Sequence, residues 1–284
     1  MDSLKFAIDA IRHSPVLVFD VETSGLDWKR NFVCGYVIGD QSDRHVYLPL
    51  RHGGGGNIPD GDHTPVTNES PHRQHAVEAL LAEAFDYRNL KNAGPIVGHN
   101  LKFDCHFALN HGVKLGRNLV CTQNTQALIN EYTKSFSLAS LAELYGVEAK
   151  KGEKLYEHIA IVTDTTKIGR NTMEAFWQLG GDDALAVEYA TGDGVSTLGV
   201  YLKQLEEIED QKLQQIFSLE SALIWTLVRL ERRGVKIDLE YLDVAREKLA
   251  EKVREAYNKL PADFNPRSPI QAKAYVEQFN TNWP

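Results

Sequence analysis

VLVFDVETSGLD, residues 16–27, joins an apolar run typical of a buried strand to two neighbouring carboxylates. The valines and the phenylalanine favour a strand, and Ser24-Gly25 supplies a turn after it. Asp20 and Glu22 are two residues apart, so their side chains project from the same face of that strand. Like charges this close repel each other unless a cation lies between them. Either the strand simply runs out into solvent here, or the two carboxylates belong to a metal site.

Two later segments also pair polar groups at a spacing that brings them together. In VGHNLKFD, Asn100 and Asp104 are four residues apart, on one face of a predicted helix that follows a short strand. In YATGDGVSTL, Tyr189 and Asp193 have the same spacing within a predicted long helix. Each pair alone has an ordinary explanation, because helix starts prefer polar residues and a Tyr-x-x-x-Asp spacing arises by chance.

The order of the elements places these three segments in one α/β pattern. Strands are predicted at 16–22, 31–40, 45–50 and 95–100, and helices at 71–86, 101–112 and 182–207, with two short helices within 123–146. Strands with interleaved helices predict an α/β domain with a mixed sheet. Oxygen ligands at the end of a strand suit a hard divalent ion such as Mg²⁺ or Mn²⁺. Together the three segments therefore favour the metal site.

Other parts of the chain give weaker signals. Residues 51–70 contain four consecutive glycines and predict a flexible surface loop, because no GKS/T ending supports a phosphate-binding loop. Residues 147–181 are polar and are assigned to no element. From about residue 209 only helical patterns follow, which predicts a domain boundary near 208–216.

Composition limits the class of protein. The 284 residues are 43% hydrophobic and 25% charged, as in ordinary globular proteins, and no apolar run approaches the ~18 residues of a membrane helix. The net charge of −8 argues against coating nucleic acid through the whole surface, although an active site built from carboxylates is locally acidic in any case. Cys34, Cys105 and Cys121 are widely spaced, which predicts reduced thiols in a cytosol-like compartment.

On FDVETSGLD, VGHNLKFD and YATGDGVSTL the sequence resembles a known family. These segments look like the three motifs of the DEDDy 3′→5′ exonucleases, and specifically of the proofreading domain of family A DNA polymerases. The segment SLASLAELYGV, 137–147, is similar to the stretch between the second and third motifs. The resemblance implies an RNase H-like exonuclease fold, with a mixed sheet flanked by helices, over residues 1–208.

The resemblance continues into the helical C-terminal segment, 209–284. LESALIWTLVRLERRGVKID, 219–238, is similar to the segment by which these polymerases enter their polymerase region, and FNPRSPIQAKAYVEQF, 264–279, looks like the next stretch. The palm and fingers would need several hundred more residues, so polymerase activity is not expected of this chain. The resemblance also implies a cytoplasmic protein of a bacterial or phage-infected cell, which acts alone or with the rest of a polymerase.

The resemblance assigns roles to five residues. It implies that two divalent cations, Mg²⁺ or Mn²⁺, flank the scissile phosphate. Asp20, Glu22 and Asp193 would hold the first ion, and Asp20 would bridge to the second. Asp104 would position the second ion, through water. Tyr189 would orient the attacking water, with assistance from Glu22.

The residues that read the substrate follow only from the resemblance. Leu26 would wedge against the terminal base, and Asn100 and Phe103 would contact the last nucleotides of a single-stranded DNA 3′ end. The ordinary alternatives are a turn-packing leucine, a helix N-cap and a core phenylalanine. Several cations are candidates for contacting phosphates, although a solvated surface explains most of them: Lys29, Arg30, Lys102, Lys150, Lys151 and Lys154.

Two competing functions stay open. An exoribonuclease of the RNase D type shares the five site residues, although residues 219–238 favour the polymerase lineage. A non-catalytic nucleic-acid-binding module is the alternative from another class, and the presence of all five site residues argues against it.

Overall fold

The central element is a five-stranded mixed sheet, as the sequence predicts. The computed structural model describes residues 2–60, 72–90, 94–116, 118–148, 152–164 and 170–279. The strands are β1 (Leu17–Thr23), β2 (Val33–Asp40), β3 (His45–Pro49), β4 (Ile96–Gly98) and β5 (Leu119–Cys121), in the sheet order β3-β2-β1-β4-β5. The first three form an antiparallel meander, and β4 and β5 join β1 in parallel. Strand β5 is not among the predicted strands, because a segment of three residues is too short to show alternation.

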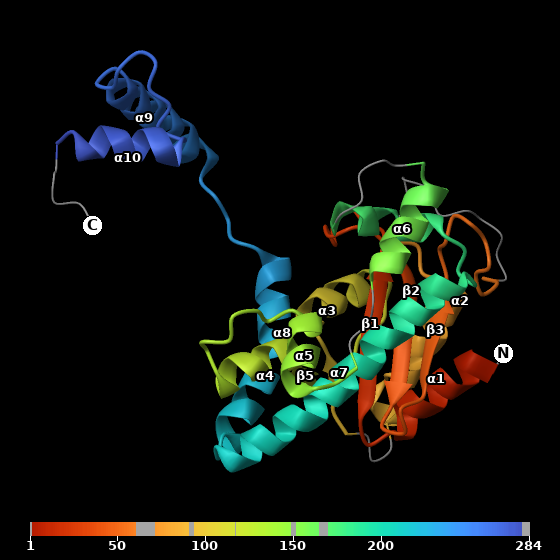
Figure 1. Cartoon of the computed structure of the whole chain (residues 1–284). Helices are drawn as coiled ribbons and strands as arrows, with labels where there is room; N and C mark the ends of the chain where they lie inside the picture. The colour runs from red at the N-terminus through yellow and green to blue at the C-terminus, as the bar shows by residue number, and fades with distance from the viewer. Residues whose placement is uncertain are drawn as a thin grey trace. The chain divides into compact units, whose positions relative to one another are not determined.

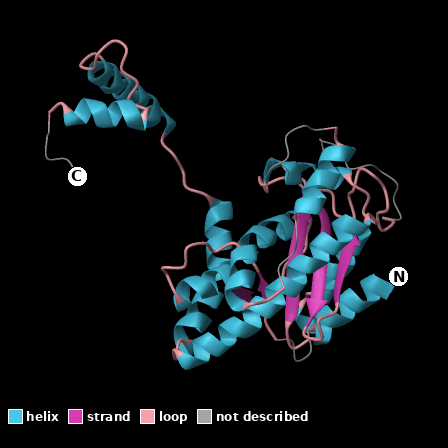
Figure 2. Cartoon of the chain, viewed as in Figure 1, coloured by secondary structure: helices cyan, strands magenta, loops and turns pink. Residues whose placement is uncertain are grey.

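Helices lie on both faces of this sheet (Figures 1 and 2). The helices and 3₁₀ turns within the described residues up to 210 are α1 (Asp2–His13), α2 (Ala76–Ala84), η1 (Tyr87–Asn89), α3 (Leu101–Asn110), α4 (Thr122–Ile129), α5 (Leu138–Tyr145), α6 (Glu153–Val162), η2 (Arg170–Gln178) and α7 (Ala184–Asp210). Helices α1 and α3 pack on one face of the sheet, and α2 packs on α1. Helix α7 crosses the other face and contacts four strands.

Strand β1 separates its side chains cleanly between the two faces. Leu17, Phe19 and Val21 are buried in the core that α1, α2 and α3 share. Successive strand side chains alternate, so Asp20 and Glu22 point to the opposite face, toward α7. The two carboxylates are therefore not at a frayed strand end, because β1 continues to Thr23 and pairs with β2 along that length.

Helix α2 begins later than the sequence predicts. Its first residue is Ala76, because His75 and Glu78 form a capping box: the His75 ring accepts a hydrogen bond from the N–H of Val77, and the Glu78 carboxylate accepts one from the N–H of His75. This reciprocal pair satisfies backbone donors that would otherwise lack partners and fixes the point at which the helix starts.

Glycines let α7 approach the sheet closely. A Cβ atom at Gly194 would lie 2.4 Å from the ring of His45 in β3, and one at Gly199 would lie 2.4 Å from Val147. Glycine weakens an isolated helix by about 1 kcal/mol relative to alanine. In α7 this cost is offset by close contacts between the helix backbone and neighbouring side chains. A larger residue would prevent these contacts unless the neighbours moved.

The chain divides into two compact units, residues Met1–Arg233 and Gly234–Pro284. Helix α8 (Gln214–Arg233) packs on α3 and β5 and so belongs to the first unit, although the sequence predicts a domain boundary near 208–216. The second unit contains α9 (Leu239–Tyr257) and α10 (Pro269–Glu277). Among the described helices, none combines the length and hydropathy needed to cross a membrane. The three cysteines are buried and free.

The described part of the glycine-rich stretch, residues 51–60, is a loop, and residues 61–70 lie outside the described residues. The loop is anchored by backbone bonds to the segment before α7. The N–H of Gly53 donates to the carbonyl of Trp177 at 2.7 Å, and the N–H of Gly181 donates to the carbonyl of Gly55 at 2.8 Å. The glycine run therefore pairs with another irregular segment and is not simply a solvated surface loop.

A buried ion pair fixes this loop to α2. Arg51 donates to both carboxylate oxygens of Glu78, at 2.8 and 2.6 Å, and both side chains are almost fully buried. Tyr36 of β2 also donates to Glu78, at 2.9 Å. Burial by itself raises the pKa of Glu78, but the His111 ring, whose Nδ1 lies 3.4 Å from Oε1, and the hydrogen bonds from Arg51 outweigh it and lower that pKa to about 2.

Glu78→Gln tests this network. The pKa of Glu78 falls from 4.5 to about 2 on folding, which corresponds to about 3 kcal/mol of stability at ~1.4 kcal/mol per unit. A carboxylate whose pKa is lowered contributes this stability above its unfolded pKa and loses it as pH falls toward 2. Urea unfolding at pH 7 should show a loss of about 3 kcal/mol, and the difference from the parent should shrink as pH falls from about 4.5 to 2.

Glu83→Gln is the matched control, because Glu83 lies on the same helix, is 65% exposed and stands 3.6 Å from Arg12. It should change stability by less than about 0.5 kcal/mol. An equal loss in both variants would show that the buried pair has no special role.

Candidate active site

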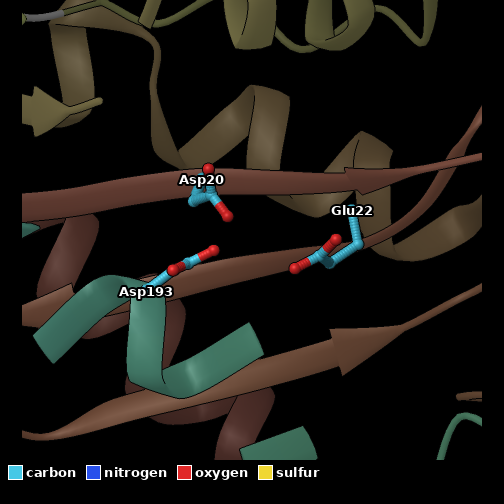
Figure 3. Close-up of side chains that lie close together, drawn as sticks. All are labelled: Asp20, Glu22 and Asp193. Atoms are coloured by element: carbon cyan, nitrogen blue, oxygen red, sulfur yellow. The ribbon is translucent and has the colours of Figure 1, made fainter. Parts of the chain in front are cut away.

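Three of the four predicted metal-binding carboxylates converge on one point. Asp20, Glu22 and Asp193 each offer an oxygen within 4.8 Å of the others (Figure 3). Strand β1 presents the first two on the face covered by α7, and α7 brings in Asp193 across that face. Segments more than 170 residues apart in sequence thus form one acidic cluster.

The fourth carboxylate, Asp104, lies beside this cluster and bonds to the backbone of β1. Its Oδ1 accepts a hydrogen bond from the N–H of Val21 at 3.0 Å. Strand β4 pairs with β1 only at Leu17 and Val18, so this N–H has no partner in β4, and α3 supplies Asp104 in its place. Burial and then the nearby charge of Asp20 raise the pKa of Asp104 well above its usual range. A charged Asp104 is therefore unfavourable mainly because it is buried, and in the second place because Asp20 is close.

Tyr189 lies one turn before Asp193 on α7, as the spacing predicts. Its ring packs against Phe176 of η2, with centroids 6.2 Å apart. Burial and then the charges of Asp193 and Glu22 raise the pKa of Tyr189 far above its usual range. The phenol is therefore neutral at every physiological pH and keeps a proton that it can donate.

A cavity of about 290 Å³ opens beside the acidic cluster. Glu22 and Tyr189 line one part of it, and the predicted substrate residues Leu26 and Phe103 line another. Leu26 is 72% exposed, so it is not a buried turn-packing residue. Phe103 is half-buried and packs on Phe107, with ring centroids 4.8 Å apart.

Three further residues of the cavity wall are absent from the sequence analysis. They are Tyr156 of α6 and Met173 and Glu174 of η2. Both elements lie in the segment 147–181 that the sequence leaves unassigned. Nothing in their local pattern marks them as functional, because only the tertiary fold brings α6 and η2 over the end of β1.

Asn100 stands apart from this wall. It occupies the N-cap position of α3 with a left-handed backbone (φ 54°, ψ 36°), and its side chain makes no capping hydrogen bond. Asparagine tolerates this conformation better than most residues, so the backbone alone explains its presence. Its side chain is exposed and does not line the cavity, and its predicted contact with DNA stays a prediction.

The predicted phosphate-contacting cations have varied surroundings. Lys102 pairs with Glu231 of α8 at 2.5 Å, and Arg30 stands 3.4 Å from Asp27. Lys29 lies over the ring of Trp28, and Lys154 is exposed. Lys150 and Lys151 lie outside the described residues. The structure therefore provides no continuous basic surface from the described members of this set.

The acidic cluster suits a divalent cation. All three donors are carboxylate oxygens, the ligand type that Mg²⁺ and Mn²⁺ prefer. Bonds of about 2.1 Å place ligands on opposite sides of Mg²⁺ about 4.2 Å apart, so a limit of 4.8 Å requires only a small side-chain movement. The donor set fits the expected ion, and a cation would also relieve the repulsion among the three charges.

Comparisons with known proteins agree with this geometry. A DNA polymerase of Vibrio phage phiVC8, DpoZ, is 28% identical over 271 residues, which cover 90% of this chain and 38% of the phage protein. The POL domain of Pol1 from M. smegmatis, in complex with DNA primer-template and dNTP, has a TM-score of 0.59 and 17% identity over 96% of this chain and 39% of that one. NrnC of Brucella melitensis with bound Mg²⁺ has a TM-score of 0.52 and 13% identity over 80% and 89% of the two chains.

The sheet order and these likenesses define an RNase H-like nuclease fold. A family model described as a 3′-5′ exonuclease matches residues 1–209. The chain belongs to this 3′-5′ exonuclease family of family A DNA polymerases, and it spans about two fifths of the length of its phage polymerase relative. The resemblance drawn from the three motifs is thereby confirmed.

Repulsion within the cluster leads to a binding test that does not require activity. Millimolar Mn²⁺ should raise the melting temperature of the parent by several degrees, because the ion binds the folded site and not the unfolded chain. Asp193→Asn removes one of three charges, so the metal-free variant should be at least as stable as the parent and should lose most of the Mn²⁺-dependent shift.

Asp210→Asn, at the exposed end of the same helix, is the control and should keep the full shift. If Asp193→Asn responds to Mn²⁺ as strongly as the parent, Asp193 is not a ligand.

Proposed function

We propose that the chain removes nucleoside monophosphates from the 3′ end of single-stranded or frayed DNA, as the proofreading exonuclease of a family A polymerase. The observation that carries this proposal is the acidic cluster of Asp20, Glu22 and Asp193 beside a cavity whose wall includes apolar side chains. The cluster supplies ligands for divalent cations. The cavity offers a place for one terminal nucleotide next to them.

Two divalent cations, Mg²⁺ or Mn²⁺, are the proposed cofactors. Asp20, Glu22 and Asp193 would hold the first, and Asp20 and Asp104 would help to hold the second. When bound, such ions activate the attacking water and stabilise the leaving 3′ oxygen. Asp104 suits an indirect role, because its Oδ1 is committed to the N–H of Val21.

Tyr189 is proposed to orient the attacking water. Its hydroxyl belongs to a side chain that lines the cavity together with Glu22, and its high pKa keeps it a donor. A neutral donor holds the oxygen of the water in place without competing for its proton. Glu22 then accepts the hydrogen bond from that water and assists its deprotonation.

Leu26 and Phe103 are proposed to receive the terminal base. An exposed leucine at the rim and an aromatic ring in the wall provide apolar contact without hydrogen-bond readout. Contacts of this kind accept any base, so removal should be tolerant of sequence. A base that is unpaired enters more easily than one held in a duplex, which is the basis of proofreading by fraying.

The polymerase context is part of this proposal. Residues 1–208 would be the exonuclease domain, and residues 209–284 the helical start of a polymerase region, in a longer chain or beside one. The contacts of α8 support a direct connection between the two parts. Arg232 of α8 donates to the carbonyl of His106 and to the side chain of Asn110, both in α3. DNA 3′ ends are the proposed partners.

An exoribonuclease is the second candidate, because NrnC shares the fold and the same hydrolysis proceeds on either sugar. Matched DNA and RNA oligonucleotides with a labelled 5′ end separate the two: the proposal requires faster digestion of DNA. Absence of metal-dependent cleavage of either strand would favour a non-catalytic binding module.

Asp193→Ala tests the assignment of the acidic cluster. Loss of one ligand should reduce hydrolysis of a labelled single-stranded DNA by at least about 10³-fold, while circular dichroism shows an unchanged fold. Asp210→Ala, on the exposed end of the same helix, should retain the parental rate. Parental activity of Asp193→Ala would leave the proposed site without support.

Tyr189→Phe separates orientation of water from metal binding. Removing only the hydroxyl should lower the single-turnover rate by about 10- to 100-fold and leave Mn²⁺ affinity, measured by calorimetry, unchanged. Tyr201→Phe makes the same change on the same helix in a separate apolar cluster and should have no effect on the rate. A parallel loss of metal affinity in Tyr189→Phe would make Tyr189 a structural support for the ligands instead.

A further inference from the structure

We propose that His52 and Phe176 are positioning residues for Tyr189, which together tie the proposed water-orienting phenol to strand β3. This inference rests on the proposed role of Tyr189. Neither residue belongs to the sequence motifs, and neither lines the cavity beside the cluster. Both are buried within the described part of the chain.

Aromatic rings form an unbroken series from β3 to the site. Tyr47 meets His52 edge-on, with centroids 5.8 Å apart, and His52 meets Phe176 at 5.4 Å. Phe176 then meets Tyr189 at 6.2 Å. Tilted and edge-to-face contacts at these distances are favourable, and interlocked rings of this size resist displacement.

Hydrogen bonds lock the second ring of this series. The hydroxyl of Tyr47 lies 2.7 Å from Nε2 of His52, and Nδ1 of His52 lies 3.2 Å from the carbonyl oxygen of Leu179. A carbonyl only accepts, so the His52 proton is on Nδ1, and Nε2 accepts from Tyr47. Burial lowers the pKa of His52 and keeps the ring in this neutral form. Both ring nitrogens are used, and His52 has a single orientation.

The glycine run also binds residues 177–181, the segment that follows Phe176, through backbone hydrogen bonds. Besides the bonds of Gly53 and Gly55 to residues 177 and 181, the N–H of Gly54 donates to the carbonyl of Leu179 at 3.2 Å. A Cβ atom at Gly54 would lie 2.6 Å from the backbone nitrogen of Gly180. Only glycine permits this approach, so the run serves to press the loop against the segment that carries Phe176.

The series connects Tyr189 to the same sheet that carries two carboxylates of the acidic cluster. Strand β3 pairs with β2, and β2 pairs with β1, which carries Asp20 and Glu22. Through His52 and Phe176, the ring of Tyr189 is therefore packed against the sheet from which the two carboxylates project. Helix α7 alone fixes only the backbone of Tyr189, whereas Phe176 contacts the ring that determines where the hydroxyl points.

Phe176→Leu tests the inference, with Phe85→Leu as its matched control. Both phenylalanines are fully buried, but Phe85 packs on Phe19 in the core on the opposite face of the sheet. Both variants should lose thermal stability. Only Phe176→Leu should lower the single-turnover cleavage rate, by about tenfold or more. A displacement of a catalytic group by about 1 Å can reduce the rate by up to about 10²-fold. Mn²⁺ affinity by calorimetry should be parental in both.

The double variant Phe176→Leu/Tyr189→Phe shows whether the effect passes through Tyr189. If it does, Phe176→Leu should change the rate less than twofold once the hydroxyl is absent. A parental rate in Phe176→Leu, an equal loss in Phe85→Leu, or an undiminished loss in the double variant would each overturn the inference. Parental activity of Tyr189→Phe would instead refute the proposed role of Tyr189 itself.

Tyr47→Phe provides the test if Phe176→Leu does not fold. It removes one oxygen, leaves every ring in place and frees His52 from its 2.7 Å partner. The expected result is a smaller fall in rate, about threefold, with parental Mn²⁺ affinity and the same loss of effect when Tyr189 is Phe. An unchanged rate would contradict the link from β3 to Tyr189.

Discussion

Electrostatic repulsion among Asp20, Glu22 and Asp193 is the constraint on which the site depends. Three carboxylates with oxygens within 4.8 Å of one another are unfavourable in a partly buried place unless positive charge is supplied. At the edge of the cluster, burial and then the charge of Asp20 raise the pKa of Asp104. The proposed cations would offset this repulsion, so the arrangement that the fold holds suits the metal-dependent role proposed for it.

Rigid surroundings make that arrangement possible. Strand β1 lies at the centre of the sheet, with β2 on one side and β4 on the other, so Asp20 and Glu22 cannot move apart without breaking strand pairing. Helix α7 is held down by the close approach of Gly194 to His45, immediately beside Asp193. A helix with a larger residue at 194 would have to rise from the sheet. Asp193 would then be carried away from its two partners.

The sequence predicts the parts of this site that obey local rules. Alternation in β1 places Asp20 and Glu22 on one face, and helical spacing places Tyr189 with Asp193. No local rule says that these two faces meet, and for that step the resemblance to a known family was needed. The mixed sheet followed from the order of the elements, whereas β5, at three residues, was too short to show a pattern.

The cavity-wall residues and the ring series could not be predicted from the sequence, for a different physical reason. Tyr156, Phe176 and Glu174 lie in 147–181, which contains only the short helix α6 and the 3₁₀ segment η2 among its described residues. Such short elements give a weak pattern in the sequence. The glycine run was interpreted as a flexible loop, since glycine has no side chain by which a packing partner can be inferred. In the structure that absence of a side chain is the reason for the packing, because it allows two backbones to hydrogen-bond directly.

Two irregular segments therefore stabilise each other beside a site that regular elements build. Strand β1 and helix α7 bring the charges together, and a structure of this kind tolerates little change in spacing. The loop 51–57 and the segment 176–181 instead place His52 and Phe176, the rings that pack behind Tyr189. Substitutions there alter orientation and fit without removing a ligand. Variation in rate and substrate preference among chains with the same carboxylates should therefore arise in these segments more than in the motifs themselves.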